Sequence, residues 1–242
     1  MGEETQTSPL YQCSIVILGS FNPGIFQPEW IERFGILPEQ EVKAVIEPGA
    51  TVTLSDGKTK APAFIITPEI TQILFPTFQL KVGLSRFEFL TLQRDEFERV
   101  PEVVIKIFHL LPHTPISAVG INFNIHLPIK DDVNEILKSY FQGKFFTEES
   151  SFSDGNNLLQ ILGESYEIWG TFRCKKEEDT VTVQVQPSLR IENGIYLDYN
   201  FHSDLQDKTA KELVDILTKN FLTDFEIARK IQYFISREES GL

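Results

Sequence analysis

The most constraining feature of the sequence is an alternation of apolar and polar residues in two separate stretches. In Gly120–His126 the apolar residues occupy every second position, and Ile195–His202 repeats the pattern. Successive side chains of a β-strand point to opposite faces of the sheet, so each stretch predicts a strand with one apolar and one polar face. Strands of this kind are typical of antiparallel sheets that have one face on the core and the other in water.

Amphipathic helices are predicted beside these strands. Apolar residues recur with the helical period in Phe97–Leu111, with Pro101 in the first turn, and again in Asp132–Phe141. The last helix begins at the capping box Thr209-x-x-Glu212 and extends toward the C-terminus. Runs of strands followed by helices predict an α+β fold with largely antiparallel sheets, amphipathic helices and two weakly repeated halves.

The stretch 147–157 is the most loop-like part of the chain, because serine, glycine, asparagine and acidic residues fill it. It divides the chain near its middle. We therefore predict an N-terminal α+β half at 1–146, a loop or linker at 147–157, and a C-terminal α+β half at 158–242 that ends in a helix.

Shorter signals predict the local structure of the N-terminal half. Asp56-Gly57 is a strong hairpin-turn signal, so we expect Thr51–Leu54 to be followed by a return strand at Ala63–Thr67. The alternation that begins at Phe78 changes phase at Ser85-Arg86, which predicts two adjacent strands.

The charge balance excludes some partners. The chain has 22 lysine and arginine residues against 35 aspartate and glutamate residues, and its net charge is −13. A field of this sign repels polyanions, so we predict no direct binding of nucleic acid. Complementary charge accelerates encounter, so we expect another protein, a basic one, as the partner. The sequence sets no oligomeric state.

Cysteine usage and the chain start bear on the compartment. Cys13 and Cys174 each lie in an apolar, strand-like run without metal-binding spacing, which predicts buried free thiols. The first residues are polar and acidic, unlike a signal peptide, and no run of apolar residues is long enough for a membrane span. We therefore expect a cytoplasmic protein with no membrane partner.

Familiar catalytic and cofactor motifs are missing from the sequence. No glycine-rich phosphate loop and no Gly-x-Ser-x-Gly elbow occurs, so no cofactor is predicted. His109 and His113 are four residues apart, but Pro112 lies between them and no glutamate follows the first, so no metal site is predicted. These observations favour a non-catalytic protein, although a carboxylate pair assembled in three dimensions escapes sequence analysis.

The polar faces of the two alternating stretches are the candidate binding site. They consist of Asn122, Asn124 and His126 in the first stretch and Asp198, Asn200 and His202 in the second. One interpretation is the wet face of an antiparallel sheet. The other is a shared polar groove for a peptide or small ligand. Alternation determines which side chains point together within a strand and leaves the relation between the two strands open.

An aromatic segment is the second candidate. Trp30 and Phe34 share one face of a short helix that begins near Pro28. Aromatic side chains at this spacing are typical of core packing, and they also serve as anchors in protein interfaces.

Three segments follow one another in the chain: Phe78–Leu92, Val119–Phe123 and Ile195–Phe201 with its trailing helix. Their order resembles a sporadically distributed prokaryotic family of uncharacterised α+β proteins with no established activity. After Gly120 an Arg-Tyr pair is more typical of that family than Asn-Phe. The resemblance implies a bacterial intracellular protein, is compatible with an accessory role in a defence or regulatory cassette, and carries over no catalytic residue.

We therefore expect a non-catalytic protein-binding or regulatory module, such as an accessory subunit, inhibitor or adaptor. The alternative is an enzyme or small-ligand-binding protein that uses the polar strand faces around His126 and His202. An enclosed pocket lined by both polar sets would favour the alternative. An open polar sheet face with an apolar patch elsewhere would favour protein binding.

Overall fold

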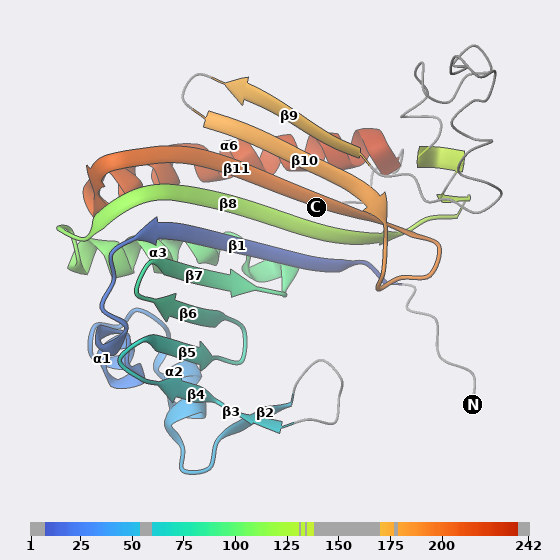
Figure 1. Ribbon diagram of the computed structural model, residues 1–242. Coiled ribbons are helices and arrows are strands. Elements are labelled where there is room, and N and C mark those ends of the chain that lie inside the picture. Colours follow the sequence, from blue (N-terminus) through green and yellow to red (C-terminus); the bar gives the residue numbers. More distant parts are fainter. Residues whose placement is uncertain are drawn as a thin grey trace, which may run out of the picture.

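The chain is organised around one large antiparallel sheet (Figure 1). The computed structural model describes residues 8–53, 60–130, 132–133, 135–137, 170–176 and 179–236. Within these residues the sheet has nine strands in the order β4-β5-β6-β7-β1-β8-β11-β10-β9. In chain order they are β1 (Leu10–Gly19), β4 (Phe64–Ile66), β5 (Ile70–Leu74), β6 (Gln79–Gly83), β7 (Arg86–Thr91), β8 (Pro115–Pro128), β9 (Gly170–Lys176), β10 (Asp179–Pro187) and β11 (Gly194–Thr209).

Helices and a small second sheet complete the described structure. The second sheet pairs β2 (Thr51–Thr53) with β3 (Lys60–Pro62). The helical elements are η1 (Pro23–Ile25), α1 (Pro28–Arg33), α2 (Glu39–Ile46), η2 (Arg94–Glu96), α3 (Arg99–Leu110) and α6 (Ala210–Ser236). The predicted α+β fold with a largely antiparallel sheet is confirmed.

The strand order contains an internal repeat. From β5 to β7 the chain passes through neighbouring strands toward β1 and then forms α3; from β9 to β11 it passes toward β8 and then forms α6. The repeat therefore equates β8 with β1, whereas the two strands of like sequence pattern, β8 and β11, are direct neighbours. The predicted loop at 147–157 lies outside the described residues, so the division into two halves stays a prediction.

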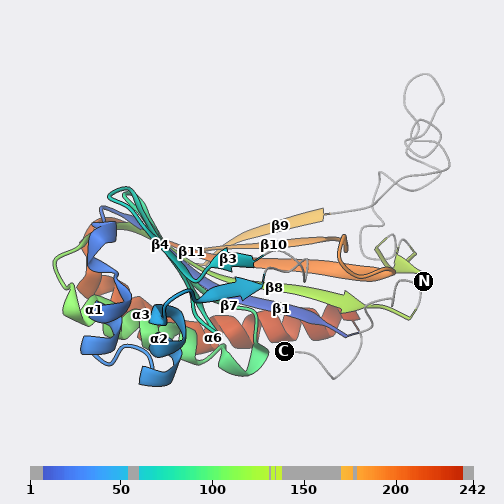
Figure 2. The same cartoon turned by 90° about the horizontal axis from the view of Figure 1, so that it is seen from below.

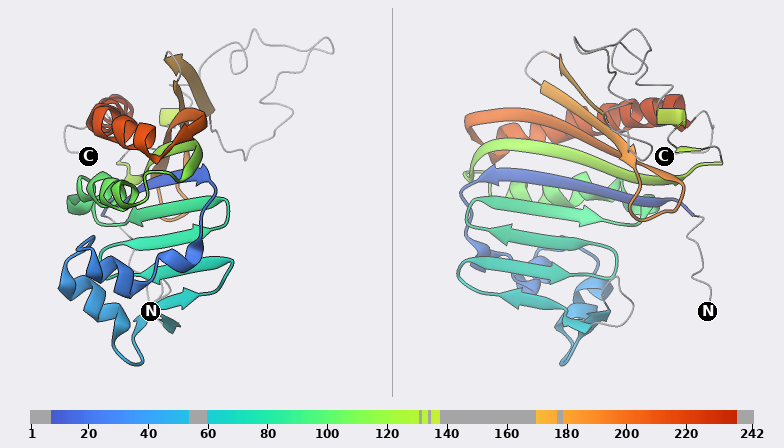
Figure 3. Two further views of the ribbon diagram at one scale, coloured as in Figure 1. Left: turned by 90° about the vertical axis from the view of Figure 1, so that its left-hand side faces the viewer. Right: turned by 45° about the vertical axis from the view of Figure 1, so that its right-hand side comes forward.

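The described helices lie on one face of the sheet. Figures 2 and 3 show α1, α3 and α6 on the same side, with the opposite side of the central strands uncovered by any described helix. Ile121, Phe123 and Ile125 of β8 are buried on the helix side. The polar residues between them are partly exposed on the other side, as the alternation predicted. We call this other side the open face.

Phenylalanine rings fill the space between the sheet and the helices. Phe123 is fully buried at the centre, with neighbouring ring centroids 5.4–6.2 Å away in edge-on or tilted contacts. The neighbours are Phe97, Phe201, Phe221 and Phe225. They come from β11, from α6 and from the residues before α3. Aromatic contacts of this geometry add to the burial of apolar area, so this cluster holds the helices on the sheet.

Several local signals are confirmed. Pro28 is the first residue of α1, and Gly35 follows this helix with a φ of +58°, a conformation that favours glycine. Pro101 lies in the first turn of α3. The backbone N–H of Thr209 donates to Glu212 Oε2 over 3.0 Å at the start of α6. Of the helix predicted at Asp132–Phe141, residues 133 and 135–137 are helical and the others lie outside the described residues or before the helix.

A strand lies within the predicted range Ala63–Thr67, but its predicted role as the return strand of the hairpin is wrong. β2 pairs instead with β3, and β4 joins the large sheet beside β5. Ala63 lies between the two sheets: its N–H donates to the carbonyl of Ala50, and its own carbonyl accepts from the N–H of Leu74. This residue is buried, so the chain changes sheets at a packed position that the turn signal alone did not indicate.

Two further expectations concern single features. Cys13 lies on the core face of β1 as a free, fully buried thiol, and burial raises its pKa well above the usual value. The side chain of Cys174 lies outside what the structure describes. Among the described residues, no helix combines the length and the apolar character that crossing a membrane requires.

Candidate functional site

The two polar sets come together on the open face. β8 and β11 are neighbouring antiparallel strands in which Asn124 lies opposite Asp198 and Asn122 lies opposite Asn200. The relation that the alternation left open is therefore a side-by-side one on a single sheet face. His126 lies opposite Tyr196 at one end, and His202 lies opposite Gly120 at the other. Whether this surface binds a partner stays a prediction.

Side-chain amides join the strands across the open face. Asn124 Nδ2 donates to Asp198 Oδ1 over 2.7 Å and to the Tyr196 hydroxyl over 2.8 Å. Asn200 Nδ2 donates to Asn122 Oδ1 over 2.5 Å, and Asn122 Nδ2 reaches Ser14 Oγ on β1 over 3.3 Å. These bonds limit the rotation of the side chains, so their remaining polar atoms have defined positions.

A hollow of about 350 Å³ opens over Gly120. We call it the Gly120 hollow. Its lining comes from β7, β1, β8 and β11 and includes Val16, Arg86, Glu88, Asn124, Asp198, Asn200 and His202. Gly120 and Ala118 are the small residues of β8 there, and a Cβ atom at Gly120 would stand 3.2 Å from Asn200 Nδ2. The missing side chain at position 120 therefore lowers the floor of this hollow.

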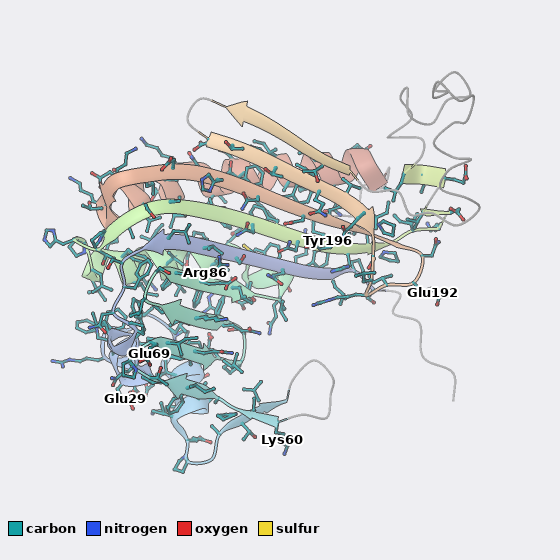
Figure 4. All side chains as sticks on the ribbon, in the orientation of Figure 1. Glu29, Lys60, Glu69, Arg86, Glu192 and Tyr196 are labelled. Carbon is teal, nitrogen blue, oxygen red and sulfur yellow. The ribbon has the colours of Figure 1, made fainter. Side chains whose placement is uncertain are left out.

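A second hollow, of about 310 Å³, lies toward the other end of β8. We call it the His126 hollow. Its lining includes Gln12, Asn124, His126, Gln186, Arg190, Tyr196 and the exposed Leu189. Gln12 and Asn124 also line the Gly120 hollow, so the two hollows adjoin. Figure 4 labels Arg86 of β7, which lines the Gly120 hollow, and Tyr196 of β11, which lines the His126 hollow.

The hydrogen bonds of Ser188 define the state of His126. Ser188 Oγ accepts from the backbone N–H groups of Arg190 (3.1 Å) and Ile191 (2.9 Å), which occupy both of its lone pairs. Its hydroxyl hydrogen therefore donates to His126 Nδ1 over 2.8 Å, which leaves the ring hydrogen on Nε2. Burial, with the charge of Arg190, lowers the pKa of His126, so the ring is neutral at pH 7.

This arrangement speaks against a serine nucleophile at His126. A nucleophilic hydroxyl needs a free lone pair directed at the substrate, and both lone pairs of Ser188 are bound to backbone N–H groups. The ring of His126 also packs against that of Tyr196, with centroids 4.6 Å apart and planes 31° apart. His126 therefore offers a ligand one fixed donor, Nε2–H, rather than an activated partner.

His126 and His202 lie too far apart to share one reaction. The register places them six strand positions from one another along β8 and β11, which corresponds to about 20 Å. A general acid and base must each come within hydrogen-bond reach of the same reacting group. The enzyme alternative could therefore use only one of these histidines. In the part of the chain that the structure describes, no group of three or more His, Cys, Asp or Glu residues gathers as a metal site.

Asp198 has an unusual environment for a carboxylate. It is partly buried, and this burial raises its pKa, while the hydrogen bond from Asn124 acts in the opposite direction. Burial and the nearby charge of Asp198 also raise the pKa of Tyr196. Because the hydroxyl of Tyr196 accepts from Asn124, its own hydrogen stays available as a donor.

The aromatic segment lies away from these hollows. Trp30 packs against the core with its ring edge-on to Phe26, at a centroid distance of 5.8 Å. Phe34 is 48% exposed, and the guanidinium of Arg33 lies 5.8 Å from its ring centre. A largely apolar hollow of about 370 Å³ lies nearby, and its lining includes Phe21, Ile25, Phe26, Leu111 and Pro115. The two candidate sites are thus separate surfaces.

Some residues of the site were not among the predicted ones. Tyr196 lies two positions before Asp198, so the same alternation could have placed it on the polar face. Gln12 and Ser14 also follow an alternation along β1. No sequence signal indicated the roles of Ser188 and Gly120. These roles depend on His126 and Asn200, which are distant from them in the sequence.

Comparisons with known proteins add no functional information about this site. No family model matches the chain, and a search of curated proteins found none of similar sequence. The resemblance based on segment order therefore stays a prediction, and functional inference rests on the residues of the open face.

Proposed function

We propose that the chain is a non-catalytic protein-binding module whose contact surface is the open face of its sheet. The observation that carries the proposal is the pair of adjoining open hollows, lined by both polar sets, in place of one enclosed pocket. Sites for small molecules usually surround most of the ligand. An open surface of ordered polar groups instead suits a macromolecular partner, as expected of an accessory subunit, inhibitor or adaptor in a bacterial defence or regulatory cassette.

The chemistry of the open face supports a polypeptide partner. Five residues of the lining carry side-chain amides: Gln12, Asn122, Asn124, Gln186 and Asn200. Each amide carries both donors and acceptors, and so does the peptide backbone. A polypeptide segment across these strands can therefore exchange hydrogen bonds with side chains that are already held in place.

The net charge supports a basic partner. A charge of −13 attracts positively charged proteins and speeds their encounter. An inhibitor that holds a nucleic-acid-binding protein away from its target would have this character. The contribution of charge to encounter falls as salt screens it.

A pair of glycine substitutions tests the proposal. Gly120→Val raises the floor of the Gly120 hollow, where the new Cβ atom would stand 3.2 Å from Asn200 Nδ2, the end of a side chain. Gly83→Val places the same side chain on the open face of β6, where a Cβ atom meets only carbonyl oxygens at 3.9 Å. Valine suits a strand, so both variants should fold.

The two variants are compared with the native sequence as tagged bait in the native host. We expect the native bait and the Gly83→Val bait to capture the same basic protein, and the Gly120→Val bait to fail to capture it. Thermal melting of each bait checks that the fold is intact. Equal capture by both variants would overturn the open face as the contact surface.

A further inference from the structure

Asp198 is a carboxylate without a paired cation among the residues that the structure describes. Asp198 Oδ1 accepts from Asn124, and Asp198 Oδ2 has no partner among the described residues. No described Lys, Arg or His forms an ion pair with Asp198. A partly buried charge without a partner costs free energy, and a cation that binds beside it recovers this cost.

Further acceptor oxygens belong to residues that line the same hollow as Asp198. Asp198 Oδ1 accepts a hydrogen bond from Asn124 Nδ2, which fixes the orientation of that amide and leaves Asn124 Oδ1 unbonded by described residues. Asn200 also donates through its nitrogen, so its Oδ1 is likewise unoccupied. These oxygens belong to residues that line the Gly120 hollow. The hollow thus presents several acceptor oxygens in addition to the carboxylate of Asp198, while its other carboxylate, Glu88, is paired with Arg86.

The positive groups of this hollow are engaged or distant from Asp198. Arg86 pairs with Glu88 of the same strand, with a nitrogen–oxygen distance of 3.4 Å. Asp198 lies on β11, which is separated from β7 by two strands, β1 and β8. Val16 and Leu18 of β1 add an apolar wall that can contact the methylene groups of a long side chain.

We infer that the Gly120 hollow takes an arginine side chain of the partner protein, with Asp198 as its carboxylate ligand. The inference rests on the proposed function and names the partner chemistry at the same surface. A guanidinium is planar, carries five N–H donors and accepts nothing, which matches a hollow lined by a carboxylate and several amide oxygens. A lysine ammonium is a compact charge that makes fewer bonds with acceptors set apart in this way.

The test uses blocked amino acids as probes: N-acetyl-arginine methylamide, the lysine analogue, and the uncharged citrulline analogue. The ¹⁵N-labelled full chain is titrated at pH 7, and the side-chain amide signals of Asn124 and Asn200 are followed by NMR. We expect saturable shifts with the arginine probe, at least about tenfold weaker binding of the lysine probe, and none of the citrulline probe.

Two variants localise the binding. Asp198→Asn keeps the shape of the side chain and the hydrogen bond from Asn124, so the variant should fold. Its affinity for the arginine probe should be at least about tenfold lower than that of the native protein. Gly120→Val should abolish the shifts, and Gly83→Val should leave them unchanged. Equal affinity for the citrulline probe, or native affinity in Asp198→Asn, would overturn the inference.

Partner capture separates the two proposals. If Gly120→Val abolishes capture and Asp198→Asn does not, the open face remains the contact surface and the arginine inference fails. If neither variant changes capture, the proposed function fails, whatever the probes do. Loss of capture with both variants supports both.

Discussion

The two faces of β8 differ in their role: one packs into the core, and the other presents polar groups to solvent. On the helix side Phe123 is fully buried among other phenylalanine rings. On the open side Asn122 and Asn124 hold their neighbours through hydrogen bonds and stay partly exposed. Free energy of folding therefore comes mainly from one face, while the other is free to serve a partner. Substitutions on the helix side should therefore mainly lower stability, whereas substitutions on the open face should mainly change binding.

The largest effect is expected on the helix side. Phe123→Ala removes the central ring and leaves a cavity, which should lower the free energy of unfolding by about 3–5 kcal/mol. Urea denaturation followed by circular dichroism measures this. The control is Asn200→Ala on the open face, with a loss of about 1 kcal/mol. Similar losses in the two variants would contradict the division of work between the faces.

The alternation predicted this division because it depends only on neighbouring residues. The side-chain directions of β8 and β11, the capping box of α6 and the positions of Pro28 and Pro101 are local signals of the same kind. The pairing of β8 with β11 is not local, because Asn124 and Asp198 are 74 positions apart in the chain. Sequence analysis could therefore name both polar sets without knowing that they touch.

The parts that sequence analysis missed depend on distant neighbours. Gly120 is unremarkable as a strand residue until Asn200 is placed 3.2 Å from its missing Cβ. The chain passes from the small sheet to the large one at Ala63, which is hydrogen-bonded to Ala50 on one side and to Leu74 on the other. Likewise, the sequence alone does not show that Asp198 lacks a paired cation among the described residues, because this depends on which strands lie beside it.

An intermediate effect is expected within the open face itself, where the two histidines differ. His126 is bonded to Ser188 and packed on Tyr196, so His126→Ala should cost about 1–2 kcal/mol. His202 has no hydrogen bond to a described residue, so His202→Ala should stay within about 0.5 kcal/mol. Thermal melting of both variants provides the comparison. A larger loss for His202 would mean that it, and not His126, is the structural residue.

The smallest effect should have the opposite sign. Burial raises the pKa of Asp198 in the folded protein, so the protonated form contributes stability that is present at acid pH and is lost as the pH rises through the raised pKa.

At pH 7 the ionised Asp198 therefore costs stability, and Asp198→Asn should raise the free energy of unfolding, by less than about 1 kcal/mol because the carboxyl is partly solvated. The gain should disappear below the ordinary pKa of an aspartate. The other titratable groups of this hollow are Arg86 and Glu88 of β7 and His202 of β11, so Glu88→Gln serves as the matched control for acid effects. Denaturation curves from pH 3 to pH 8 measure both variants.

A binding surface can retain a costly charge because the partner recovers the cost, so a variant that is more stable and binds less would mark Asp198 as a group kept for recognition. A less stable Asp198→Asn variant would instead show that the carboxylate supports the fold, and the contrast between the two faces of the sheet would not hold at this position.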